Sequence, residues 1–118
     1  MSLIIPKKVP KKGFYYHYKH DPAKGVNDYA YRVLNVCFHT EDDCRPEDRH
    51  LVDYRPIYPS SVYLAGKFND ARPLEMWMGD VTKDGKTFPR FQKITDPAII
   101  AKLKEIEQEM YPPEEDAD

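Results

Sequence analysis

Eleven prolines are distributed along the 118 residues of this chain, and they restrict it to short elements of secondary structure. Proline fixes its own φ and has no backbone N–H, so it breaks helix interiors and is confined to the edges and ends of strands. The prolines are not gathered in a linker, and no internal repeat is present. Because 118 residues are too few for two independent cores, we expect one small domain without long helices in its middle.

Three segments have the composition of strands. Residues 14–19 and 29–39 are dense in aromatic and β-branched residues, which suit a pleated, half-buried surface. Residues 51–57 form a third candidate, in which Pro56 predicts an edge or a bend near the end. In the second segment, Arg32 is the one misfit on a face that alternation makes apolar through Ala30, Leu34, Val36 and Phe38.

Further along, the dipeptide Asp84-Gly85 is the clearest turn signal, because both residue types tolerate positive φ. It predicts a hairpin between strands near 74–82 and 86–93, preceded by a Pro-, Ser- and Gly-containing connection at 59–66. Alternation in the first of these strands directs Leu74, Met76 and Met78 inward, and directs Glu75 and Trp77 to the other face.

Helical spacing begins near the C-terminus. Asp96 is a suitable N-cap, Pro97 suits the first helical position, and apolar residues then recur at helical intervals until position 110. About five short strands with short connections, followed by one late helix, predict an all-β or α+β fold: a small, mainly antiparallel barrel with a helix packed against it.

The two ends of the chain carry opposite charge. Residues 1–12 hold four lysines and are expected to form a flexible basic arm, residues 111–118 an acidic tail, and residues 13–110 the single folded domain. The formal net charge is −2 and the pI is about 6.1, which argues against general coating of nucleic acid.

Cysteine content and hydropathy address location. Two cysteines, Cys37 and Cys44, are too few for a disulfide scaffold and are compatible with a reducing compartment. The opening residues lack the apolar segment of a secretory signal, and no run approaches the roughly 20 apolar residues that span a bilayer. We therefore expect a soluble, cytoplasmic protein without membrane association.

Metal binding and nucleophilic catalysis are both disfavoured by spacing. His17 and His20 are three apart, so on a strand they point to opposite faces, and Cys37 with His39 lacks two further converging ligands. No serine or cysteine stands in a recognisable nucleophile motif. We expect no metal and no cofactor.

Two Arg-Pro dipeptides are the most informative polar feature. Proline stiffens the backbone around Arg55 and Arg72, so each guanidinium is held near a strand end. A guanidinium can bind a carboxylate or phosphate through a bidentate pair of hydrogen bonds. Alternatively, it forms a structural ion pair with Asp53, Asp70 or Glu75. Nine tyrosines and one tryptophan supply more aromatic surface than a small core needs, which suits stacking on bases or gripping a peptide.

A resemblance to a known family is carried by five segments in order: HYK (17–19), YRVLNVCFHTE (31–41), LVDYRPIY (51–58), ARPLEMWMGDV (71–81) and DGKTFPRFQ (84–92). Together these segments resemble the small bacterial family catalogued as domain of unknown function 1653. The resemblance implies an SH3-like small β-barrel and implies no activity, since the family is uncharacterised. Residues 20–28 and 42–50 form longer loops than the family pattern has.

By position, the recurring polar and aromatic residues of the family fall on His17, Tyr18, His39, Tyr54, Arg55, Arg72, Glu75, Trp77 and Arg90, which are the candidate binding residues. The leading hypothesis is a non-enzymatic binding module for an anionic or extended partner: a peptide, a nucleotide or single-stranded RNA. One alternative is a small hydrolase-like enzyme that uses Glu75 with His17 or His39. Another is an interaction protein that self-associates through a barrel edge or the C-terminal helix.

Overall fold

The structure, a computed structural model, describes residue 6 and residues 8–114. Five strands form one antiparallel sheet in the order β4-β3-β2-β1-β7. Parts of the predicted basic arm (1–5 and 7) and acidic tail (115–118) lie outside the described residues. The bounds of the sheet strands are β1 (Gly13–His17), β2 (Ala30–Phe38), β3 (His50–Pro56), β4 (Asp70–Pro73) and β7 (Phe91–Lys93).

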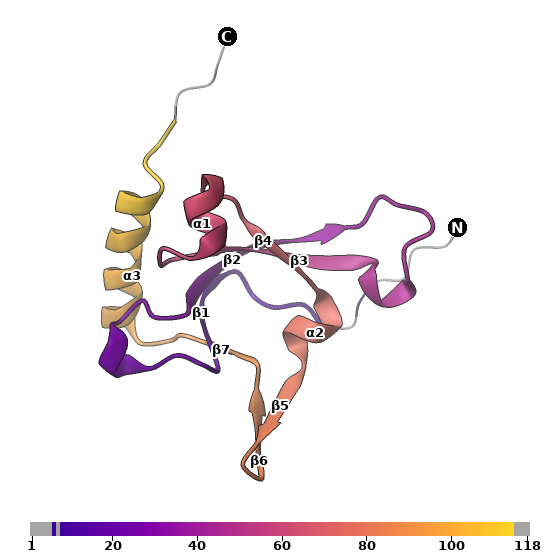
Figure 1. Ribbon diagram of the computed structural model, residues 1–118, viewed down its shortest axis with the longest axis horizontal. Coiled ribbons are helices and arrows are strands. Elements are labelled where there is room, and N and C mark those ends of the chain that lie inside the picture. Colours follow the sequence, from indigo (N-terminus) through magenta and orange to yellow (C-terminus); the bar gives the residue numbers. More distant parts are fainter. Residues whose placement is uncertain (1–5, 7, 115–118) are drawn as a thin grey trace.

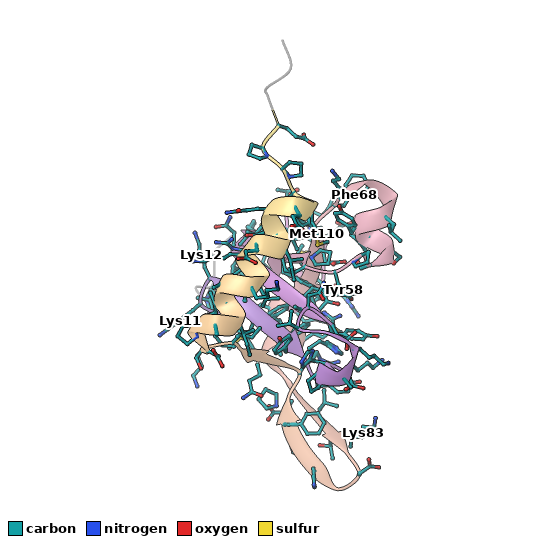
Figure 2. All side chains as sticks on the ribbon, turned by 90° about the vertical axis from the view of Figure 1, so that its left-hand side faces the viewer. Lys11, Lys12, Tyr58, Phe68, Lys83 and Met110 are labelled. Carbon is teal, nitrogen blue, oxygen red and sulfur yellow. The ribbon has the colours of Figure 1, made fainter. Side chains whose placement is uncertain are left out.

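The predicted hairpin is confirmed as a separate two-stranded sheet. β5 (Asp80–Lys83) pairs with β6 (Lys86–Pro89) across Asp84 and Gly85, whose φ values are 53° and 74°. The hairpin projects away from the main sheet (Figure 1), and Lys83 lies near its tip (Figure 2). The predicted strand 86–93 is divided at Arg90, because β7 leaves the hairpin and pairs with β1.

The predicted strand at 74–82 is wrong over its first half, which is a short helix, α2 (Leu74–Met78). Leu74 and Trp77 are both buried, while Met76 and Met78 are 49% and 43% exposed. Positions three apart share a helix face, so the helix buries the tryptophan together with the leucine. A strand would instead have buried the two methionines, and the larger apolar area of Trp77 favours the helix.

Both faces of the main sheet are covered by apolar side chains. On one face, Tyr15, Tyr31, Val33, Val52, Tyr54 and Phe91 pack with Leu74 and Trp77 of α2. On the other face, Phe14, Ala30, Ile57 and Ile94 pack with Leu103 of α3 (Pro97–Met110). Figure 1 shows α3 running along one side of the sheet. The bounds of α3 confirm the predicted helix, and the Asp96 carboxylate accepts hydrogen bonds from the N–H groups of Ala98 and Ile99.

The predicted apolar face of β2 is wrong beyond its start. A register shift between Val33 and Asn35 interrupts the alternation, as β-bulges do. Tyr31 and Val33 are therefore core residues, whereas Phe38 at the far end is 42% exposed and Cys37 is exposed.

Two elements have no counterpart in the predicted order: α1 (Ser61–Gly66), inside the expected connection, and β4. Short 3-10 turns occur at Pro22–Lys24 and Pro46–Asp48. Seven strands in antiparallel sheets with a C-terminal helix confirm an α+β fold. In the part of the chain that the structure describes, β4 and β7 are the two edges of the main sheet, and no ladder joins them into a closed barrel.

Candidate functional site

Arg72 lies on edge strand β4 and points to the tyrosine-lined face of the sheet. Its Nε donates a hydrogen bond to Tyr54 Oη at 3.2 Å, and its guanidinium lies 5.3 Å from the centre of the Phe91 ring. Among residues 6 and 8–114, no carboxylate forms an ion pair with Arg72. The Nη groups of a guanidinium held by its Nε and by a ring face are free to donate outward.

His17 ends strand β1 beside this arginine. The ring is buried, packs edge-on against Phe91 at 5.1 Å and accepts the backbone N–H of Lys19 at Nδ1. The pKa of His17 is lowered to about 4. Burial is the largest cause, and the positive charges of Arg72, Lys19 and Arg90 contribute the rest. The imidazole is therefore neutral at pH 7, and the charges of three basic side chains act on it.

Tyrosines extend the surface from His17 toward β3. The Tyr29 ring is 5.5 Å from His17 and 5.6 Å from Tyr58, whose hydroxyl shares a hydrogen bond with Tyr31. Burial raises the pKa of the Tyr54 and Tyr58 hydroxyls, so both stay protonated and uncharged. We call the set of His17, Lys19, Tyr29, Tyr54, Tyr58, Arg72 and Arg90 the Arg72 site.

Asp70 is a carboxylate whose charge interacts with that of Arg72. It stands two residues before Arg72 on β4 and opposite Tyr54 in the ladder. Burial raises the pKa of Asp70, and the charge of Arg72 partly opposes that rise. Arg72, Lys19 and Arg90 thus contribute positive charge next to Asp70, although the chain as a whole has a net charge of −2.

Arg90 joins the hairpin to the main sheet. Its backbone N–H donates to Gly79 O at 3.0 Å, and its carbonyl accepts the N–H of Tyr18 at 2.9 Å. Its Nε is buried without a hydrogen-bond partner among the described residues. The ring of Tyr18, another predicted site residue, lies 4.4 Å from that of His17, so Tyr18 borders the Arg72 site.

Arg55, in contrast, lies on the opposite face of the sheet. Its Nη1 is 3.5 Å from Glu107 Oε2 on α3, and its guanidinium lies 4.2 Å from the centre of the Tyr111 ring. Arg32, the misfit of the sequence pattern, forms an ion pair with the other oxygen of the buried Glu107 carboxylate. The structure therefore does not bring Arg55 and Arg72 together on one face, and Arg55 has a structural partner that differs from the three carboxylates named from the sequence.

Trp77 is a core residue, 2% exposed, and it supports the Arg72 site from beneath. Its indole is stacked on Phe91 at 3.6 Å with an interplanar angle of 7°, and it lies 4.7 Å from Tyr54. The two rings that Arg72 contacts are thus both fixed by Trp77. The expectation that Trp77 faces away from Leu74 is wrong, because the two residues share one face of α2.

Glu75 and His39 lie apart from this group. Glu75 is exposed on α2, and His39 follows the far end of β2, where its Nδ1 accepts the N–H of Glu41. At about 3.3 Å per residue, the stretch from Tyr29 to His39 spans roughly 30 Å. In the described part of the chain, no hydrogen bond joins Glu75 to His17 or His39.

Two further properties bear on chemistry. Among residues 6 and 8–114, no three His, Cys, Asp or Glu side chains gather as a metal ion would require. In that same part of the chain, every helix is too short or too polar to cross a bilayer.

Lys19, Tyr29, Tyr58 and Asp70 are members or neighbours of the Arg72 site that the sequence analysis did not select. Lys19 is part of the HYK segment (17–19) that carries the family resemblance, so the sequence could have indicated it as a site residue. Tyr29 has a φ of 49°, a left-handed conformation that nothing in its sequence context announces. Tyr58 and Asp70 reach the site only through the β2-β3-β4 pairing, which connects distant segments.

Fold and site together define a small α+β protein in which basic side chains lie next to the tyrosine-rich core of an antiparallel sheet. The profile of the family described as "Protein of unknown function (DUF1653)" matches residues 13–93, and this chain belongs to that family. The match begins with β1 and ends with β7, so it includes the Arg72 site and leaves α3 outside. Neither the curated proteins nor the solved structures gave a match.

Proposed function

We propose that the protein is a non-enzymatic binding module whose Arg72 site holds an anionic partner. The observation that supports this most strongly is an unpaired guanidinium next to the neutral ring of His17. Arg72 and His17 both pack on Phe91, and no carboxylate pairs with Arg72 among the described residues. The positive charges of Arg72, Lys19 and Arg90 also help to lower the pKa of His17, and a bound anion would offset them. A phosphate or carboxylate group is the simplest such partner.

The orientation of Arg72 also supports an anion. Its Nε is occupied by Tyr54 and one face by Phe91, which leaves the two Nη groups to donate in the same plane. Two parallel N–H donors match the spacing of two oxygens of a phosphate or carboxylate. The neutral hydroxyls of Tyr54 and Tyr58 add donors without charge.

We infer further that the tyrosine-lined face is the interior of a small barrel of the SH3-like kind, left open between β4 and β7. Residues of β1, β2, β3 and β7 share one core with α2, as expected for a strongly curled sheet. We also infer that residues 13–110 act as one unit, since Glu107 of α3 pairs with arginines of β2 and β3.

The cytoplasm is the location we propose. Cys37 and Cys44 are both free, and Cys37 is exposed. Exposed thiols persist where the surroundings are reducing.

The test is Arg72→Gln, followed by amide NMR titration with inorganic phosphate. Losing the guanidinium with its two outward donors should weaken phosphate binding by at least about tenfold. Arg45→Gln is the matched control, because Arg45 is exposed and pairs with Asp48 in a 3-10 turn away from the site. Equal phosphate affinity of the Arg72 variant and the wild type, with both folded, would contradict the proposal.

A further inference from the structure

A pocket of about 340 Å³ adjoins the Arg72 site at His17. It is lined by Tyr16, His17, Tyr18, His20, Phe88, Pro89 and Gln92. These residues come from the end of β1, from the turn after it and from β6 and β7, so the projecting hairpin forms one wall. Five of the seven have aromatic or imidazole rings, which makes the pocket suited to a flat, unsaturated group.

The rings of this pocket are held in place from both sides. Tyr16 is stacked on His20 at 3.6 Å, and its hydroxyl donates a hydrogen bond to Val26 O. Tyr18 lies 5.8 Å from Phe88 and 4.4 Å from His17. Rings fixed in this way lose little freedom when a ligand stacks on them, which favours binding.

Two cations of the Arg72 site stand at the border of the pocket. Lys19 lies between Tyr18 and His20 in the chain, and its Nζ is 5.9 Å from the centre of the Tyr18 ring. Arg90 lies between Pro89 and the β7 strand that contributes Gln92, and its buried Nε has no partner among the residues described. The arrangement places a flat apolar surface beside donors of positive charge.

From this juxtaposition we propose that the pocket binds the base of a nucleotide and that Lys19, Arg90 and Arg72 bind its phosphate. A nucleotide joins a flat ring to a phosphate in one molecule, and stacking on aromatic side chains beside basic residues is how proteins hold single-stranded nucleic acid. Gln92, exposed at the rim, has the donors and acceptor that a base edge requires. The proposal rests on the anion-binding function above and names its ligand class.

The experiment titrates the full chain with four probes, followed by amide NMR: inorganic phosphate, adenosine, adenosine 5′-monophosphate, and a six-nucleotide oligouridylate. We expect the monophosphate to bind about tenfold more tightly than either phosphate or adenosine, because only it uses both parts of the site. If the oligouridylate binds more tightly than the monophosphate, the source is a nucleic acid strand. The reverse order indicates a free nucleotide.

Two variants address the pocket itself. Phe88→Ala should lower monophosphate affinity about tenfold and leave phosphate affinity unchanged, whereas Phe38→Ala, at the far end of β2, should change neither. If Phe88→Ala unfolds the hairpin, Gln92→Ala provides a second variant. It removes the side-chain amide that would bind the base edge, so it should weaken the monophosphate and leave phosphate affinity unchanged.

Failure of this proposal is distinguishable from failure of the anion-binding function. If phosphate binds through Arg72 but the monophosphate gains nothing from its base, the nucleotide proposal is overturned and the anion site remains. Phosphotyrosine, titrated separately as a comparison ligand, would overturn it in the same way if it bound more tightly than every nucleotide probe. If no phosphate-containing probe shifts the amides of the Arg72 site, both proposals fall.

Discussion

Arg55-Pro56 and Arg72-Pro73 are the same dipeptide on neighbouring strands, yet the two arginines lie on opposite faces of one sheet and have opposite surroundings. Arg55 shares the buried Glu107 carboxylate with Arg32 and stacks on Tyr111. Arg72 has an aromatic ring and a hydroxyl but no carboxylate among the described residues. The comparison shows that the dipeptide positions a guanidinium, while the element packed against that face decides whether it is neutralised.

Glu107 neutralises the arginines on the α3 face of the sheet, so replacing it should have the largest effect on stability. Glu107→Gln leaves two arginines opposite a neutral amide, and the free energy of unfolding should fall by about 2 kcal/mol, since both guanidiniums keep some contact with water. Urea unfolding measures this loss. Phosphate affinity should not change, because α3 packs on the other face.

The matching control is Arg72→Gln under the same urea titration. With no ion pair to lose, Arg72 should contribute less than about 1 kcal/mol to stability. If the Arg72 variant is destabilised as much as the Glu107 variant, Arg72 is a structural residue, and the contrast between the faces disappears.

The free energy of unfolding should depend on pH through His17, which lies on the same face of the sheet as Arg72. The pKa of His17 is lowered to about 4 by burial and by the three neighbouring cations. Between its ordinary value of about 6.5 and 4, the unfolded chain binds a proton that the folded chain does not, so stability falls as pH falls through that range. Above about pH 6.5 this contribution is constant.

His17→Gln removes that contribution. The stability advantage of the wild type over the variant should therefore be smaller at pH 4.5 than at pH 7, as measured by urea unfolding at both values. An advantage that stays the same at the two pH values would mean that folding does not perturb His17, and that the three cations do not act on its ring.

Asp70→Asn should have the smallest effect of these substitutions, and it should strengthen phosphate binding. The substitution removes the carboxylate whose charge opposes Arg72, so phosphate should bind a few-fold more tightly to the variant. Calorimetric titration with phosphate measures the change. Weaker binding would indicate that Asp70 holds Arg72 in position and does not merely reduce the charge of the site.

The sequence predicts those elements that are stabilised mainly by interactions between residues close together in the chain. The cap at Asp96, the proline after it and the turn at Asp84-Gly85 fixed the last helix and the hairpin, and both are confirmed. Strand composition predicted β1, β2 and β3 to within a residue or two. The family resemblance is also confirmed.

Long-range packing explains what the sequence could not predict. Leu74–Met78 alternates like a strand, but the burial of Trp77 against Phe91 favours a helix there. Arg32 and Arg55 are explained by Glu107, a residue more than fifty positions along the chain that no local pattern connects with them. The sequence predicts Arg72 as a candidate binding residue, whereas Tyr29 and Tyr58 are brought close to it only by the strand pairing.

The measurement that tests the account most directly is the NMR titration of the His17 ring, with and without saturating inorganic phosphate. The account predicts a pKa near 4 for the free protein, because of burial and the three surrounding cations, and a higher pKa when phosphate neutralises those cations. A pKa near 6.5 that phosphate leaves unchanged would contradict it, since His17 would then be neither surrounded by uncompensated positive charge nor next to a bound anion.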